Sequence, residues 1–117
     1  MNLADKTCEP CRGDVAPMDR QKAEEMLAQV PGWTLSDDGS RISREFKVKN
    51  YVEATDFVRW VGHAAENAGH HPDISFGWGY ATVTFFTHKI DGLHENDFIM
   101  AARVNGIFED YEEDPAQ

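Results

Sequence analysis

Apolar residues recur along the chain with two different periods, and these periods predict the elements and their order. Helical spacing predicts three helices, over residues 19–29, 50–68 and 95–108. Alternation of apolar and polar residues predicts four strands, over residues 33–35, 42–48, 74–78 and 81–88. The order is α-β-β-α-β-β-α, and short turns such as Asp38-Gly39 join the strands. We therefore predict an α+β fold, in which a four-stranded antiparallel sheet carries three helices on one face.

Signals at the helix ends support this division. Asp19 and Asn50 are suited to cap the first two helices at their N-termini. Gly69 is suited to end the second helix, and Pro72 prevents that helix from resuming. We therefore expect the second helix to end before the third strand begins.

The length and the charge of the chain limit the number of domains and the kinds of partner that it can have. A chain of 117 residues has the length of one domain. We expect an irregular N-terminal arm over 1–17, a single domain over 18–108 and an acidic tail over 109–117. The formal net charge of −10 disfavours direct binding to nucleic acid or to anionic membranes. Because no apolar run is long enough to span a membrane and no signal peptide is visible, we expect a cytoplasmic protein.

Cys8 and Cys11 form a single Cys-x-x-Cys pair in the N-terminal arm. A zinc ribbon needs a second pair of ligands, and a thioredoxin-type motif opens a helix after a strand. We expect reduced thiols without a catalytic role. A metal site completed by histidines and a disulfide between the two cysteines remain alternatives.

Chemically active residues gather where the second helix gives way to the third strand. Glu66 and His70 are spaced i, i+4, so they face each other if the helix persists to His70. His71 follows directly. If the next hairpin turns near Gly79, His71 falls opposite His88. The three imidazoles would then lie at one end of the sheet.

Imidazoles beside a carboxylate are suited to proton transfer, because imidazole accepts and donates protons near neutral pH. No serine or cysteine nucleophile is evident beside these histidines. Two other interpretations remain open. The histidines can be ordinary exposed residues at a corner, or His63, Glu66 and His70, spaced i, i+3 and i+7, can ligate zinc.

Seven residues of the chain have distinctive spacings: Glu66, His70, His71, Pro72, Trp78, His88 and Asp97. This set resembles the signature of the pterin-4a-carbinolamine dehydratases. The segments Pro31-Gly32-Trp33, Thr87-His88 and Gly92-Leu93 are also similar to that family. The resemblance extends over about residues 18–108, and the Cys8-x-x-Cys11 arm is similar to that of bacterial members.

The resemblance implies an enzyme, a hydro-lyase that converts 4a-hydroxytetrahydrobiopterin to quinonoid dihydropterin and water in tetrahydropterin recycling. By the same resemblance, His70 and His88 would be the acid/base pair, and His71 would bind or orient the pterin. The supporting or substrate-binding residues would be Glu66, Asp97, Trp78 and Thr87. The resemblance implies no metal and no cofactor. The expected partners are the pterin and further copies of the chain, in a homodimer or homotetramer.

Other functions remain open at this point. The chain can be a non-catalytic dimerisation or binding module, or a dehydratase-like protein that acts on another pterin. A metalloprotein that uses Cys8, Cys11 and His63 is a third alternative. We expect His63 and His94 to be surface residues without a catalytic role.

Overall fold

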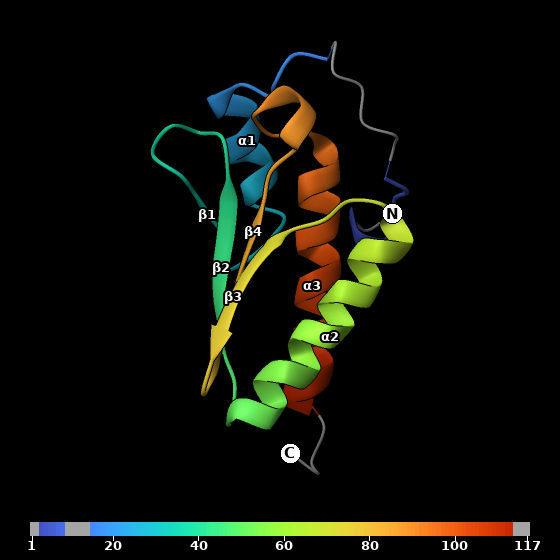
Figure 1. Ribbon diagram of the computed structural model, residues 1–117. Helices are drawn as coiled ribbons and strands as arrows, with labels where there is room; N and C mark the ends of the chain where they lie inside the picture. Colours follow the sequence, from blue (N-terminus) through green and yellow to red (C-terminus); the bar gives the residue numbers. More distant parts are fainter. Residues whose placement is uncertain (1–2, 9–14, 114–117) are drawn as a thin grey trace.

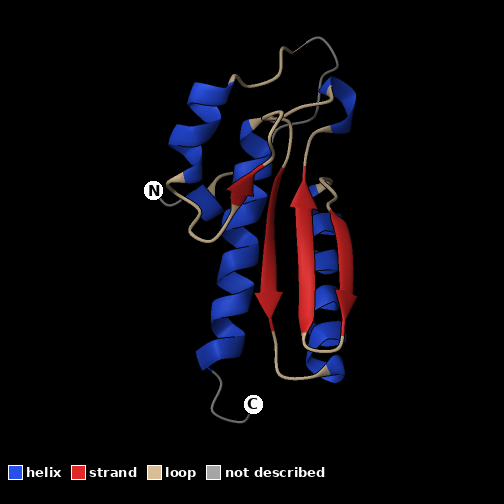
Figure 2. Ribbon diagram, turned by 90° about the vertical axis from the view of Figure 1, so that its left-hand side faces the viewer, coloured by secondary structure: helices blue, strands red, loops and turns tan. Residues whose placement is uncertain are grey.

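The computed structural model describes residues 3–8 and 15–113, and it confirms the predicted fold class and order of elements. The elements are η1 (Leu3–Asp5), α1 (Arg20–Leu27), β1 (Thr34–Leu35), β2 (Ile42–Lys47), α2 (Tyr51–Ala68), β3 (Asp73–Gly77), β4 (Tyr80–Phe85), η2 (His88–Ile90) and α3 (Glu95–Glu113). The strands form an antiparallel sheet in the order β1-β2-β4-β3. Helices α2 and α3 lie side by side over one face of the sheet, and α1 packs beside β1 (Figure 1, Figure 2).

The predicted helix caps are confirmed. Asp19 accepts a hydrogen bond from the Lys22 N–H at 2.8 Å, and Asn50 accepts one from the Glu53 N–H at 2.9 Å. Gly69 ends α2 with a φ of 68°, a left-handed conformation that glycine adopts without strain. The chain therefore leaves α2 sharply, just before the two adjacent histidines.

The core lies between the helices and the sheet and is rich in aromatic side chains. Phe46 packs against Phe57 and Phe108, with ring centroids 4.9 and 5.0 Å apart. Trp33 packs against Phe46 and Phe85, and all five side chains are buried. Because these rings come from both helices and from the sheet, their packing fixes α2 and α3 relative to the strands.

The β3–β4 hairpin turns one residue earlier than the sequence predicts. Asp73 pairs with Thr84, two residues away from the partner that a turn centred near Gly79 predicts. The two-residue turn lies over residues 78–79, and Gly79 adopts a φ of 84°. The predicted pairing of His71 with His88 depended on a turn one residue later in the chain and is therefore wrong.

The strand predicted over 81–88 is shorter than expected. β4 ends at Phe85, and Thr87 then forms an isolated bridge with Gly92. His88 begins the 3-10 turn η2 instead of extending the strand. The chain therefore folds back on itself directly after the sheet.

Both ends of the described chain contain more helix than the sequence predicts. In η1, Leu3 is buried, and Arg103 of α3 donates a hydrogen bond to the Ala4 carbonyl at 3.0 Å. α3 continues to Glu113 and does not end at Phe108, in keeping with the high helix propensity of glutamate. The division into arm, domain and tail stays a prediction. None of the helices in the described ranges combines the length and the apolar character that a membrane span requires.

Candidate active site

His70 is turned into the protein by the end of α2. After the left-handed Gly69, the His70 N–H donates to the Ala65 carbonyl at 3.2 Å. The His70 residue is 6% exposed, and its ring stacks on Phe85 with centroids 6.1 Å apart and an interplanar angle of 10°. Its Nε2 lies 2.6 Å from Oδ1 of Asp97. His70 is thus a buried imidazole held by a carboxylate.

Asp97 is the centre of this cluster and is completely buried in the first turn of α3. Its Oδ2 accepts hydrogen bonds from the Thr87 hydroxyl at 2.8 Å and from the His94 N–H at 3.0 Å. Its Oδ1 pairs with His70. Because an ionised carboxylate offers only acceptor sites, these three donors can converge on it without leaving one of them unpaired.

Asp97 joins two segments of the chain at one end of the sheet. His70 belongs to the segment between α2 and β3, and Thr87 belongs to the segment after β4. Each is followed directly by another histidine, His71 or His88. The carboxylate therefore anchors the backbone one residue before each of these two histidines.

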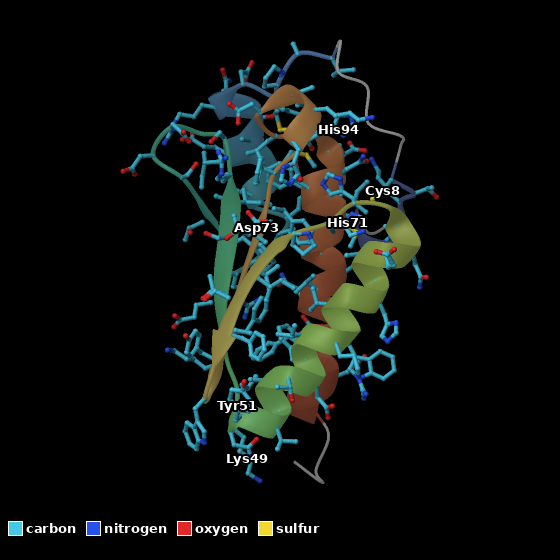
Figure 3. The ribbon with its side chains drawn as sticks, in the orientation of Figure 1. Cys8, Lys49, Tyr51, His71, Asp73 and His94 are labelled. Atoms are coloured by element: carbon cyan, nitrogen blue, oxygen red, sulfur yellow. The ribbon has the colours of Figure 1, made fainter. Side chains whose placement is uncertain are left out.

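His71 pairs with Glu66 at the surface. Its Nε2 lies 2.7 Å from Glu66 Oε2, and the two side chains are 58% and 77% exposed. The prediction that Glu66 faces His70 is wrong, because α2 ends at Ala68 and Gly69 turns His70 inward. Figure 3 shows His71 just beyond α2, at the same end of the molecule as His94. This exposed pair is available to exchange protons with a ligand.

His88 is exposed, and its ring contacts the tilted ring of Phe86. The ring centroids of His88 and Phe86 are 4.1 Å apart. The guanidinium carbon of Arg41 lies 4.0 Å from the centroid of the same Phe86 ring. In the part of the chain that the structure describes, His70 and His71 pair with carboxylates, whereas the His88 ring packs at an angle of 44° against an aromatic ring. The convergence of the three imidazoles on one pocket stays a prediction.

Trp78 lies at the other end of β3 and is 72% exposed. The five residues of β3, at about 3.3 Å each, separate Trp78 from the histidines by roughly 15–20 Å. Next to it, Phe76 packs against Tyr51 with centroids 5.9 Å apart. Figure 3 shows Tyr51 at the opposite end of the molecule from His71. Trp78 is therefore not part of the histidine cluster within one copy of the chain.

His94 has a structural role, although the sequence led us to expect only a surface residue. It is half-buried, its Nδ1 accepts a hydrogen bond from the Asn96 N–H at 3.0 Å, and its own N–H donates to Asp97. The spacing His94-x-x-Asp97 carries the signal, because a cap residue followed three positions later by an acidic side chain is a capping box. Histidine is not a common N-cap residue, and this hid the signal.

The alternatives that require a metal gain no support from the geometry. Within the described ranges, no group of three or more histidine, cysteine, aspartate and glutamate side chains is placed to hold a metal ion. The helical set of His63, Glu66 and His70 is broken, because Glu66 and His70 bond to other side chains. Cys8 is half-buried against the core, but Cys11 lies outside the described residues, so the state of the pair stays a prediction.

Fold and site together define a small α+β protein with a histidine site built at one end of its sheet. The family model described as "Pterin 4 alpha carbinolamine dehydratase" matches residues 16–107. The chain belongs to this family, as its sequence resemblance implies.

Similar proteins extend over most of the chain. A protein of Halorhodospira halophila that carries the family's name is 58% identical over 107 residues, which are 92% of this chain and 98% of that protein. A crystal structure from Brucella melitensis, described as a transcriptional coactivator/pterin dehydratase, covers 78% of this chain and 97% of its own with 31% identity and a TM-score of 0.74. A pterin dehydratase-like RuBisCO assembly factor of the alpha-carboxysome covers 66% of this chain and 89% of its own, and shares the fold at 23% identity and a TM-score of 0.57.

Proposed function

We propose that the chain dehydrates 4a-hydroxytetrahydrobiopterin to quinonoid dihydropterin and water, as a step in tetrahydropterin recycling. Family membership supports the choice of a pterin substrate. The observation that carries the proposal is the position of Asp97, which binds His70 and Thr87 and so anchors His71 and His88 at one end of the sheet. An imidazole paired with a buried carboxylate, with further histidines next to it in the chain, is suited to proton transfer.

The chemistry needs one acid and one base and no change of oxidation state. The bond between C4a and the hydroxyl oxygen breaks, and the oxygen leaves as water after it gains a proton. A base removes the proton of the adjacent ring N–H, and that electron pair forms the new carbon–nitrogen double bond. General acid–base catalysis of this kind typically contributes about 10²–10⁴ in rate.

We assign the acid and base roles to His70 and His88. Nε2 of His70 pairs with Oδ1 of Asp97. The carboxylate would stabilise the imidazolium that forms when His70 takes a proton, as in other aspartate–histidine pairs. His71, with Glu66 beside it, would bind and orient the pterin from the exposed side of the site.

We also propose that the chain works as a homodimer or homotetramer. β3 is an edge strand of the sheet, and Phe76 and Trp78 are 38% and 72% exposed. An edge strand offers unpaired backbone groups to a second strand, and exposed aromatic residues beside it favour association. A second copy of the chain fits both features.

The direct test is a dehydration assay with freshly formed 4a-hydroxytetrahydrobiopterin, followed by stopped-flow absorbance. The chain should accelerate the appearance of quinonoid dihydropterin above the spontaneous rate in proportion to its concentration. A folded chain that binds the pterin without accelerating the loss of water would instead support the non-catalytic binding module.

A further inference from the structure

The first turn of α3 is closed by a histidine. His94 directly precedes Glu95, the first residue of the helix, and so occupies the N-cap position. Its Nδ1 accepts a hydrogen bond from the Asn96 N–H at 3.0 Å, and its N–H donates to Asp97 Oδ2 at 3.0 Å. Asp97 thus makes the bond of a capping box from N3 back to the N-cap, and the His94 ring caps the N–H of the second helical residue, with histidine where serine, threonine, aspartate or asparagine is usual.

The cap specifies where the proton of the His94 ring resides. Because Nδ1 faces a backbone N–H, it has to present a lone pair, so the ring is neutral and carries its proton on Nε2. A ring protonated on Nδ1 would set one N–H against another and lose the bond to Asn96. The first turn of α3 thus depends on one tautomer of His94.

The cap reaches the candidate active site through Asp97. Oδ2 of this carboxylate receives the His94 N–H and the Thr87 hydroxyl, and Oδ1 is turned to Nε2 of His70. The His94 N–H is therefore one of the two donors to Oδ2 that orient the carboxylate paired with His70.

We propose that His94 is a positioning residue: its neutral imidazole locks the first turn of α3, and the locked turn aims Asp97 at His70. This inference concerns the same site as the proposed function. Of its two readouts, only kcat rests on that function, and the His70 signals do not. A cap that only stabilised the helix would leave the environment of the His70 ring unchanged. Substitutions at His94 separate these two roles, because asparagine can cap a helix and alanine cannot.

The first measurement needs no substitution. In the full chain labelled with 15N at histidine, long-range 1H–15N spectra in mildly alkaline buffer should show His94 with its proton on Nε2 and a bare Nδ1. A His94 ring that carries its proton on Nδ1 overturns the inference, whatever the activity of the chain.

The second measurement compares His94→Ala and His94→Asn with the wild type. His94→Ala should shift the imidazole 15N signals of His70 and lower kcat by about five- to tenfold, with KM little changed. His94→Asn should restore both the signals and kcat, because it supplies another cap. His63→Ala is the matched control, since His63 is exposed beside Trp60 on α2 and should leave both readouts unchanged.

The outcomes distinguish this inference from the proposed function. If the wild-type chain does not dehydrate the pterin, the proposed function is wrong, and the His70 signals still decide the role of His94. His70 signals that are the same in His94→Ala and in the wild type overturn the positioning role. If His94→Ala does not fold, His94→Gly takes its place in the comparison, because glycine removes the side-chain acceptor and is tolerated at the N-cap.

Discussion

Nε2 of His70 lies 2.6 Å from Oδ1 of Asp97, and the two side chains are 6% and 0% exposed. Because both side chains are buried, bulk solvent cannot replace the hydrogen bond of a lost partner. Removal of one member leaves the other as an uncompensated polar group in the interior, which is strongly destabilising. The pair therefore serves both the stability of the fold and the proposed chemistry.

Asp97→Asn should cost about 1–3 kcal/mol in the free energy of unfolding, because it leaves a buried donor unpaired. The amide offers one acceptor oxygen where the carboxylate offers two, so its NH2 group would meet a donor from His70, Thr87 or His94. Urea unfolding measures the loss. Asp110→Asn, at an exposed position on the same helix, is the matched control and should change stability by less than about 0.5 kcal/mol. Equal stabilities of the two variants would show that the buried carboxylate does not organise this end of the sheet.

Thr87→Val should destabilise the fold by about 1–3 kcal/mol, because valine keeps the shape of threonine and removes the hydroxyl that donates to Asp97 at 2.8 Å. Thr87→Ser retains the hydroxyl and should recover most of this loss. Thermal unfolding of the two variants measures the difference. If Thr87→Val and Thr87→Ser unfold at the same temperature, the hydroxyl is not needed at Asp97.

Most of the fold could be predicted from the sequence because local chemistry determines it. The cap at Asn50 and the left-handed Gly69 need only near neighbours in the chain, and both are confirmed. The register of the β3–β4 hairpin was not predictable in the same way, because Gly77 and Gly79 each permit a turn and only the backbone shows which one is used. A shift of the turn by one residue moved the pairing by two positions and so changed which residues meet across the sheet.

The candidate site was predictable in its composition and only partly in its contacts. The sequence placed His70, His71 and Asp97 in one site, but a helix continued to His70 would have paired that ring with Glu66. The left-handed residue before His70 reverses this pairing, and His70 turns to Asp97, 27 positions further along the chain. Contacts over such distances follow from packing of α2 on α3, which no local pattern contains.

The turn before β2 should contribute acid-dependent stability through Asp38. Hydrogen bonds from the side chains of Ser40 and Ser36, with the Ser40 N–H, lower the pKa of this carboxyl from 3.8 to about 2. A lowered pKa in the folded state gives stability that is present above pH 3.8 and is lost as the pH falls through about 2.

Asp38→Asn should remove this part of the acid dependence, and Asp37→Asn is the matched control for the change in charge. The direct measurement is an NMR titration of the Asp38 carboxyl group in the folded chain. A titration midpoint of Asp38 at the ordinary value of 3.8 would contradict the role of the two serines.

The edge strand β3 makes the oligomeric state testable. Trp78→Glu places a charge on an exposed aromatic position next to that edge, so it should shift the chain from dimer or tetramer toward monomer in sedimentation velocity. Gln21→Glu, an equal change of charge at an exposed position of α1, should leave the distribution unchanged. A wild-type chain that sediments as a monomer would contradict the proposed association.

The most direct test of the central claim, that histidines at one end of the sheet transfer the protons of the dehydration, is the dehydration rate of His88→Ala. His88 is exposed, so its removal should leave the urea unfolding midpoint unchanged. The account predicts a rate about 10²–10⁴ lower than that of the wild type, with His63→Ala unchanged. Equal dehydration rates in His88→Ala and the wild type would contradict it.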